Sequence, residues 1–375
     1  MKVYVPLVFA LFFNVVECFY VPEDWLAKHG YNVRKKAAPH YPYGWHPRSF
    51  NGKNRMNKKS DIPVGPFTDD FSQWLESTDY ADYNFPFLHL GINASYGGKE
   101  YKEQSLKHNP VVFIHGNSDG ALDAGTEFSS GFSASIKYFL SKGYTSAELY
   151  AVTWGDRQLD KSFTRKHTCP SLTRVRKFVE AVMDYTKAEK IDIIAHSMGV
   201  TFARQIIKGG LVYDPTGVCD LGKPINSKVK SFLGIAAANY GLCMCNDETS
   251  ESMPVCGKIL GFYSGSECKN GKRDPDITCA SARPEDECDP DTSVFLSHLN
   301  GKVPDKYGPL IKDADEVYSF YSEEDEIVGP NFVFGRKTSV IPFSSGVIVF
   351  PNMKHHQLKT DTVVEQYNAI ALGFV

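Results

Sequence analysis

The stretch from Lys190 to Gly210 constrains the fold of this chain more than any other. It begins with a short run of β-branched and small residues, Ile191 to Ala195, which is typical of a buried strand. Apolar residues then recur at helical spacing, and Gly209 and Gly210 end the pattern as expected of a helix C-terminus. The helical apolar positions are Val200, Ala203, Ile206 and Ile207. The sequence therefore predicts a strand, an abrupt turn and a helix.

Small residues alternate through that turn, at Ala195, Ser197 and Gly199. A turn this abrupt holds its central residue in a strained backbone conformation and needs small neighbours on either side. It presents the hydroxyl of Ser197 at the carboxyl end of the sheet, in front of the helix N-terminus. We interpret the turn as a nucleophile elbow with alanine in place of the usual first glycine. The alternative is an ordinary serine on a strand-to-helix turn.

The N-terminal residues predict export. A lysine at position 2 precedes an apolar run from Val3 to Val16, and small residues stand before a possible cleavage after Cys18. We expect a signal peptide at 1–18 and a secreted, extracellular protein. The alternative, a membrane anchor, is disfavoured because this run is short for a span and no later run is longer, so no transmembrane segment is expected.

Cysteine usage agrees with an oxidising compartment. Eight cysteines remain after Cys18, an even number that suggests up to four disulfides, whose pairing the sequence does not determine. The spacing of Cys243 and Cys245 is poor for zinc, so no metal is expected. Asn93-Ala94-Ser95 is a glycosylation sequon, with Asn93 as the acceptor.

A formal net charge of −3 and a hydrophobic content of 42% indicate a large core and no nucleic-acid partner. The segment 19–87 is a basic N-terminal arm followed by an entry segment. Its first part, to Lys59, is irregular and rich in lysine, arginine and aromatic residues. It is either an extended arm on the domain surface or an arm that contacts anionic lipid headgroups.

From position 88 to 375, patterns typical of buried strands alternate with helical patterns, which predicts an α/β fold with a mostly parallel, helix-covered sheet. We expect an entry strand and loop at 88–98 and strands at 110–114, 148–154, 191–195, 229–238, 317–321 and 346–350. We expect helices at 71–75, 121–142, 171–182, 198–207 and 362–372. Ligands of such sheets lie beyond the carboxyl ends of the strands.

The segment 241–290 interrupts this alternation. It holds six cysteines, few aliphatic residues and many Asp, Glu, Gly and Pro. It predicts a disulfide-stapled insertion that is separate from the core. Its place after a strand allows it to cap the carboxyl ends of the sheet; the alternative is a surface loop.

An acidic residue and a histidine follow the last two strands. The acid lies in Ser322-Glu-Glu-Asp325-Glu, where three glutamates crowd the aspartate, and Ile327 and Val328 are expected to point into the core. The chain order of serine, acid and histidine is that of the α/β-hydrolases, not of chymotrypsin-like or subtilisin-like enzymes.

The histidine is either His355 or His356. We favour His355 because Leu358 lies three residues beyond it, the place of the apolar residue that anchors the next helix in related hydrolases. The base must reach Ser197 with one ring nitrogen and donate to the acid with the other, so a shift of one residue misplaces both contacts.

Over about 88–372 the chain resembles the class 2 lipases. The resemblance rests on Asn109-Pro-Val-Val-Phe-Ile-His-Gly116, Ala195-His-Ser-Met-Gly199, Ser293-Val-Phe-Leu-Ser-His-Leu-Asn300 and Asp325-Glu-Ile-Val328. It implies Ser197 as the nucleophile and Asp325 as the residue that orients the base. The backbone N–H groups of Asn117 and Met198 would form the oxyanion hole, and no cofactor would be needed. The basic arm and the Cys-rich segment have no counterpart in the small bacterial members.

The expected function is that of a secreted serine lipase or carboxylesterase, with a lipid or ester substrate at an oil–water or membrane interface. A phospholipase or another acyl hydrolase is the alternative within enzymes. A catalytically silent lipid-binding protein that retains the fold is the alternative from another class.

Overall fold

The computed structural model describes residues 62–266, 278–283, 286, 290–302, 310–329 and 331–373, together with the backbone of a short strand, β1 (Val33–Lys35). The expected signal peptide, the rest of the basic arm, and Cys268 and Cys288 lie outside these residues. Among the described helices, none is long and apolar enough to cross a membrane.

The core of the fold is an eight-stranded sheet in the order β1-β12-β9-β8-β5-β3-β4-β2. Every neighbouring pair is parallel except β2 and β4, which are antiparallel. The strands are β2 (Ser95–Tyr96), β3 (Val111–Ile114), β4 (Leu149–Val152), β5 (Ile191–His196), β8 (Val229–Ile235), β9 (Glu316–Ser322) and β12 (Gly346–Phe350). Because β4 and β5 lie on opposite sides of β3, the strand order reverses there, and ligand sites of α/β sheets lie at such points.

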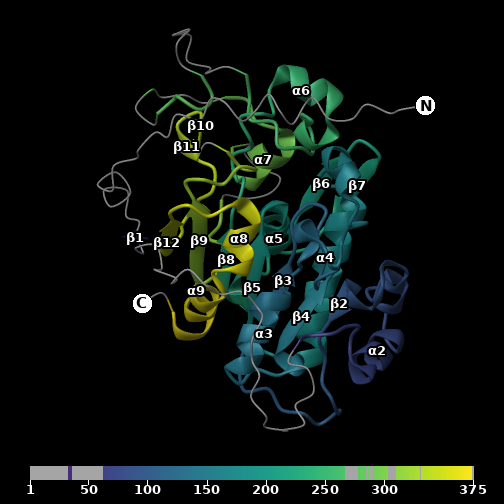
Figure 1. The fold of residues 1–375 in the computed structure, drawn as a ribbon. Helices are drawn as coiled ribbons and strands as arrows, with labels where there is room; N and C mark the ends of the chain where they lie inside the picture. The colour runs from purple at the N-terminus through teal and green to yellow at the C-terminus, as the bar shows by residue number, and fades with distance from the viewer. Residues whose placement is uncertain are drawn as a thin grey trace, which may run out of the picture.

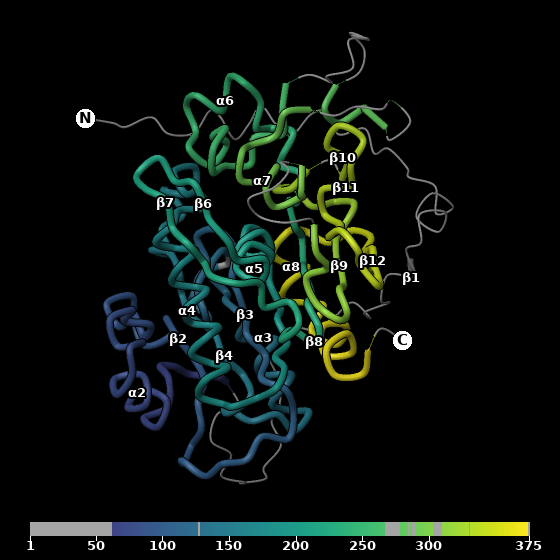
Figure 2. The backbone as a smooth tube through the Cα atoms, turned by 180° about the vertical axis from the view of Figure 1, so that it is seen from behind, coloured from purple at the N-terminus to yellow at the C-terminus, as the bar shows by residue number. Residues whose placement is uncertain are grey.

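Helices cover both faces of the sheet, as predicted (Figures 1 and 2). On β3, Val112 and Ile114 pack on one face, and Val111 and Phe113 on the other, as strand alternation requires. The first face is covered by α2 (Asp69–Glu76), α4 (Cys169–Thr186) and α5 (Met198–Lys208). The second face is covered by α3 (Ser133–Ser141), α8 (His355–Thr360), α9 (Val363–Tyr367) and the π-helical turn η10 (Asn368–Leu372).

Smaller elements complete the described chain. Two antiparallel hairpins are formed by β6 (Leu211–Asp214) with β7 (Gly217–Asp220) and by β10 (Phe332–Val333) with β11 (Arg336–Lys337). Two short helices are α6 (Asp247–Ser252) and α7 (Val294–Leu299). The 3₁₀ turns are η1 (Ala81–Tyr83), η2 (Leu88–Leu90), η3 (Ile92–Ala94), η4 (Glu127–Ser129), η5 (Ser146–Glu148), η6 (Leu159–Thr164), η7 (Asn226–Lys228) and η8 (Pro254–Cys256).

Two local predictions were wrong. The helix expected at 121–142 begins only at Ser133, because Gly125 and Gly131 adopt positive φ angles of 86° and 53° that a helix does not permit. A side chain at Gly131 would also lie 2.4 Å from the backbone of Leu122. The entry strand expected at 88–98 consists mainly of 3₁₀ turns, and only the two residues of β2 pair with the sheet.

The Cys-rich segment is not separate from the core, contrary to the sequence-based prediction. Its described first part, 241–266, contributes five buried side chains to the same apolar cluster as α5: Cys245, Val255, Cys256, Leu260 and Phe262. It lies beyond the carboxyl ends of the strands (Figure 1). Disulfides join Cys243 to Cys279 and Cys245 to Cys256, and a third joins Cys169 to Cys219 on the β7 hairpin. The segment can pack into this cluster with few aliphatic residues, because aromatic and half-cystine side chains fill the buried positions.

A buried arginine on α5 connects this helix to loops at the carboxyl ends of the strands. Arg204 is 0% exposed, and its Nε lies 3.1 Å from Oδ2 of Asp313. Its Nη1 donates to the side-chain oxygens of Asn239, after β8, and Asn300, after α7, at 3.0 and 2.9 Å. Burial raises the pKa of Asp313, and the guanidinium opposes that rise. The helix behind Ser197 is thereby fixed to two loops at the carboxyl side of the sheet.

Replacing Arg204 by methionine should lower the free energy of unfolding by about 3–5 kcal/mol, because Asp313 would be left buried without its cation. Denaturant unfolding measures this change. Lys190→Met is the matched control, since it removes the cation of a half-exposed pair with Asp315 and should cost about 0–1 kcal/mol. Equal losses in the two variants would contradict the structural role assigned to Arg204.

Candidate active site

The turn between β5 and α5 has the strained geometry that the sequence predicts. Ser197 has a φ of 55° and a ψ of −130°, outside the regions that non-glycine residues favour. A Cβ at Gly199 would lie 2.4 Å from the carbonyl oxygens of Ile114 and His115, and a Cβ at Gly116 would lie 2.8 Å from Cβ of Ser197. The turn therefore packs directly on the end of β3. The hydroxyl of Ser197 is half-buried and forms no hydrogen bond with the described residues.

The structure brings His355 and Asp325 together. Asp325 lies in the loop after β9, and its Oδ2 and Oδ1 are 2.8 and 3.0 Å from Nδ1 of His355, the first residue of α8. Both residues are buried. Burial alone would raise the pKa of Asp325, but His355 and the N–H groups of Ile327 and Val328 hold it below its usual value. Asp325 is therefore an ionised acceptor that orients the imidazole.

The neighbours of Asp325 are arranged differently from one another. Val328 is buried as expected, but Ile327 is 47% exposed, so the prediction that it points into the core was wrong. The turn is instead fixed by the hydrogen bonds that the N–H groups of Ile327 and Val328 donate to the carboxylate of Asp325. All three glutamates are exposed, and Glu326 accepts a hydrogen bond from the N–H of His355 at 3.0 Å.

The backbone of His355 is held from both ends. Its N–H donates to Glu326, and its carbonyl oxygen lies 3.1 Å from Nε2 of His196, the residue before Ser197. The rings of His196 and His355 have centroids 4.6 Å apart. Burial holds the pKa of His196 well below its usual value, so this ring is neutral and donates from Nε2. The start of α8 is thus joined directly to the turn that carries Ser197.

His356 has different surroundings from its neighbour. Its ring meets Phe128 edge to face, with centroids 5.3 Å apart, and its Nδ1 is buried with no partner among the described residues. Burial lowers the pKa of His356 to about 4. Unlike His355, it contacts no carboxylate of the part of the chain that the structure describes.

The loop after β3 is held by His115. Its Nε2 accepts from the backbone N–H of Trp154 at 3.0 Å, and its Nδ1 lies 2.7 Å from the carbonyl oxygen of Gly116. The indole of Trp154 donates to the carbonyl of His115 at 2.8 Å and stacks on its ring. Burial lowers the pKa of His115 to about 4, so the ring is neutral and serves to fix the loop. Within the described residues, neither the N–H of Asn117 nor that of Met198 has an acceptor.

A buried ion pair links this loop to α8. Lys359, one helical turn beyond His355, contacts Asp119, and both side chains are 1% exposed. Burial would raise the pKa of Asp119, but the ammonium of Lys359 holds it below its usual value. The loop after β3 and the helix that begins at His355 therefore form one unit.

His196, Glu326, Asp119 and Lys359 were not identified from the sequence. Only Lys359 could have been found from a local pattern, because it lies with His355 and Leu358 on the buried face of a short helix, where a lysine is unusual. The roles of His196 and Glu326 arise from contacts with residues far away in the sequence. Among the described residues, no group of His, Cys, Asp or Glu is arranged to hold a metal ion.

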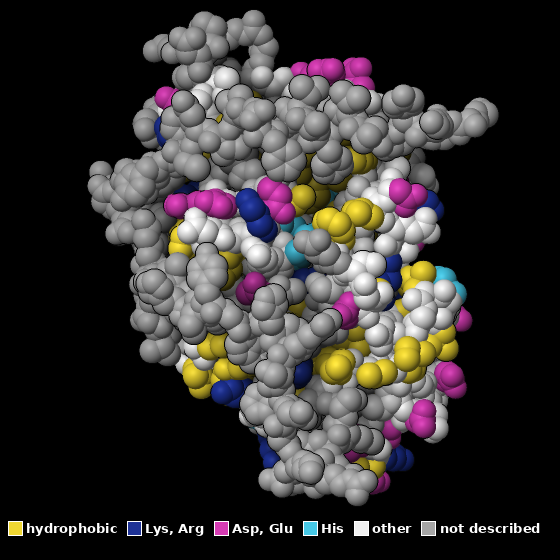
Figure 3. All heavy atoms as spheres, viewed as in Figure 1, with side chains coloured by type: hydrophobic (Ala, Val, Ile, Leu, Met, Phe, Trp, Pro, Cys, Tyr) yellow, Lys and Arg dark blue, Asp and Glu magenta, His cyan; other side chains and the backbone are white. Residues whose placement is uncertain are grey.

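On the face shown in Figure 3, histidine side chains reach the surface near the centre, beside basic, acidic and hydrophobic side chains. The sequon residue Asn93 is half-buried, and its Nδ2 donates to the carbonyl of Asp123 at 2.8 Å. Its glycosylation stays a prediction.

The family described as lipase (class 2) matches residues 108–368. Solved structures similar to this chain include Aspergillus fumigatus lipase B, 14% identical with a TM-score of 0.35, over 69% of this chain and 48% of that one. They also include a Paleococcus ferrophilus monoacylglycerol lipase, 15% identical with a TM-score of 0.38, over 72% of this chain and 97% of that one. The chain thus spans about half the length of the fungal lipase.

Gly199→Ala should destabilise the protein by about 1–3 kcal/mol, because the new Cβ would collide with two carbonyl oxygens of β3 and its exit. Thermal unfolding monitored by circular dichroism measures the loss. The control is Gly155→Ala, whose added Cβ would meet only the Arg165 side chain, at 3.7 Å. A wild-type melting temperature for Gly199→Ala would show that the turn does not pack on β3 as described.

Proposed function

This chain belongs to the class 2 lipase family, and we propose that it is an ester hydrolase that cleaves carboxylic esters through a serine acyl-enzyme. Ser197 is the nucleophile, His355 the base and Asp325 the residue that orients the base. The observation that carries this proposal is the buried hydrogen bond between His355 and Asp325 at 2.8 Å, at the start of a helix joined to the Ser197 turn through His196.

The first half-reaction follows from the protonation states. In the neutral imidazole of His355 the proton on Nδ1 is donated to Asp325, and the lone pair on Nε2 can take the proton of the Ser197 hydroxyl. The Ser197 oxygen attacks the ester carbonyl, and the carbonyl oxygen becomes negatively charged. The free N–H groups of Asn117 and Met198 donate to this oxyanion. Collapse of the tetrahedral intermediate expels the alcohol, which takes the proton from His355.

The second half-reaction uses the same groups with water in place of the alcohol. His355 takes a proton from water, and the resulting hydroxide attacks the acyl-enzyme carbonyl. Collapse breaks the bond to Ser197 and releases the carboxylic acid, while His355 returns its proton to the serine oxygen. Every proton transfer passes through one ring nitrogen, and the proposed steps need no metal or organic cofactor.

Exposed apolar side chains support an acyl substrate. Phe128, 41% exposed, lies against His356, and Leu159 and Phe163, 49% and 43% exposed, lie on η6. The carbonyl of Ser162, between these two, accepts from the side chain of Asn117 at 2.8 Å. We propose that these residues contact the acyl chain or the surface of a lipid aggregate, so the substrate is an acylglycerol or a related lipid ester.

The Cys-rich segment is proposed to form a wall of the substrate site. It reaches the segment before α4 through Leu260, whose carbonyl accepts from the N–H of His167 at 3.0 Å, and it reaches the β11 hairpin through Gly241 and Thr338. The three disulfides support our proposal that the protein is secreted.

Ser197→Ala should lower kcat for a soluble p-nitrophenyl ester by roughly 10⁵–10⁶-fold, because no other nucleophile stands at the elbow. The folded state should be retained, as judged by circular dichroism. Ser130→Ala is the matched control, because the buried Ser130 hydroxyl has no partner among the described residues. Undiminished hydrolysis by Ser197→Ala would refute the serine mechanism. A wild-type protein that binds lipid vesicles but hydrolyses no ester would favour the silent lipid-binding protein.

Removal of His355 and removal of His356 should have clearly different effects on kcat. His355→Ala should reduce kcat by several orders of magnitude, since it removes the base. His356→Ala should reduce it far less, because His356 contacts Phe128 and, among the described residues, no acid. Steady-state kinetics on one soluble ester compares them. The reverse ranking would assign the base to His356.

A further inference from the structure

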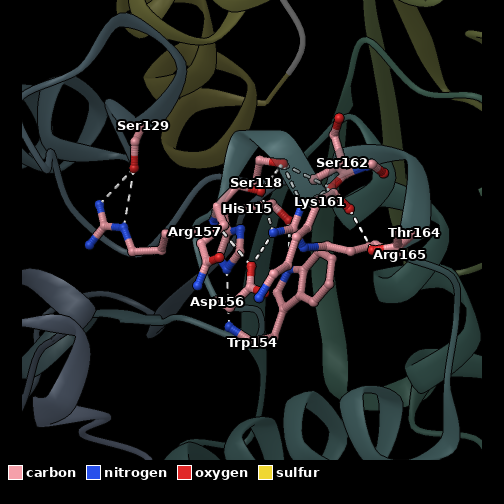
Figure 4. A network of polar contacts seen from close by, with 12 residues as sticks. His115, Ser118, Ser129, Trp154, Asp156, Arg157, Lys161, Ser162, Thr164 and Arg165 are labelled. Carbon is pink, nitrogen blue, oxygen red and sulfur yellow. Dashed lines mark hydrogen bonds and ion pairs between the residues drawn. The ribbon is translucent and has the colours of Figure 1, made fainter. Parts of the chain in front are cut away.

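The segment that follows β4 is hydrogen-bonded to the loop that carries Asn117. Figure 4 shows the network, with His115 and Trp154 at its centre and Arg157 and Arg165 on opposite sides. Arg165 donates from Nη1 to Oδ1 of Asn117 at 2.9 Å and to Oγ of Ser118 at 2.5 Å. Its Nη2 donates to the carboxylate of Asp156 and to the carbonyl of Gln158. One guanidinium thus joins two loops by four hydrogen bonds.

The amide of Asn117 is held on both of its ends. Arg165 donates to its oxygen, and its Nδ2 donates to the carbonyl of Ser162, which belongs to the same segment as Arg165. With the amide plane fixed on two sides, the side chain cannot rotate, and the rotation of the backbone that bears it is restricted. The N–H of Asn117 is the proposed oxyanion donor, so its direction depends on these contacts.

The backbone next to Asn117 also requires support. Ser118 has a φ of 62°, and such conformations in non-glycine residues cost on the order of 1–3 kcal/mol. The hydroxyl of Ser118 accepts from Arg165 and lies 3.3 Å from the carbonyl of Gln158. Without Arg165, the loop loses the contact that holds the strained residue in place.

We propose that Arg165 is a positioning residue that holds the Asn117 N–H in the direction of the oxyanion. This inference rests on the proposed function, because it needs a tetrahedral intermediate on Ser197. A donor that is displaced by about 1 Å can lose roughly 10²-fold in rate. Arg165 acts through Asn117 and does not itself touch the reacting atoms.

The chain provides a matched control at the same carboxylate. Lys161 lies 3.8 Å from Asp156, and its side chain is 51% exposed, whereas the side chain of Arg165 is 9% exposed. Lys161→Met and Arg165→Met each remove one cation from Asp156. Only Arg165→Met removes the bonds to Asn117 and Ser118.

The test compares wild type, Arg165→Met, Arg165→Lys and Lys161→Met on a soluble p-nitrophenyl ester. For both Arg165 variants we expect kcat to fall by roughly 10–10²-fold with little change in KM, because the lost interaction acts on the transition state. Lysine retains the positive charge but cannot donate to all four acceptors, so Arg165→Lys should not restore kcat. Lys161→Met should stay within about twofold of wild type, as is usual for an exposed pair.

A tetrahedral inhibitor distinguishes positioning from a general loss of structure. A trifluoromethyl ketone adds reversibly to Ser197, and its oxygen becomes the oxyanion. Its inhibition constant should rise in the Arg165 variants by the same factor as kcat/KM falls. In the Asn117→Ala background, which keeps the backbone N–H, Arg165→Met should cost less than in wild type, because only the contact of Arg165 with Ser118 remains to be lost.

Three results would overturn the inference: an unchanged kcat/KM in Arg165→Met, equal losses in Lys161→Met, or additive losses in the Asn117→Ala background. If Arg165→Met does not fold, Arg165→Lys and Asn117→Ala decide the question by the same inhibitor measurement. Failure of the proposed function appears separately, as undiminished hydrolysis and inhibition in Ser197→Ala.

Discussion

The contact between the Ser197 turn and the end of β3 is the constraint on which the rest of the site depends. The carbonyl oxygens of Ile114 and His115, at the end of β3, occupy the space that a Cβ at residue 199 would need. A Cβ at Gly116 would likewise lie too close to the Cβ of Ser197. This approach fixes a serine with positive φ, a conformation that costs on the order of 1–3 kcal/mol. The flanking strands stabilise it, since β3 is buried throughout and β8 is buried except at Lys230. Met198, which follows the serine, and Asn117, which follows Gly116, are therefore both next to residues that make this contact.

Three long-range contacts then place the histidine relative to that turn. His196 donates to the carbonyl of His355, Glu326 accepts from its N–H, and the ion pair of Asp119 with Lys359 ties its helix to the loop after β3. Each contact joins elements that lie far apart in the chain. The proposed nucleophile, base and oxyanion donors consequently belong to one connected set of loops, although no single loop carries more than two of them.

The sequence predicts those features that depend on local patterns. The strands around β5 and the elbow follow from apolar runs and small residues. An acid and a histidine after the last two strands follow from their positions, whereas the choice of Asp325 rests on the resemblance to the class 2 lipases and that of His355 on the spacing to Leu358. The late start of α3 and the packing of the Cys-rich segment were missed, because both depend on tertiary contacts, such as that of Gly131 with Leu122. Arg165 had no sequence signal, because a basic residue in a polar loop looks like solvated surface until its acceptors are known.

Covalent labelling tests the central claim most directly. The folded protein would be treated with a fluorophosphonate, which reacts with activated serines, and digested for peptide mass spectrometry, while residual hydrolysis is followed on a soluble ester. The account predicts one label per chain, on the peptide that contains Ser197, and a loss of hydrolysis in proportion to labelling. Full hydrolysis after stoichiometric labelling, or a label on another serine that accounts for the lost activity, would contradict it.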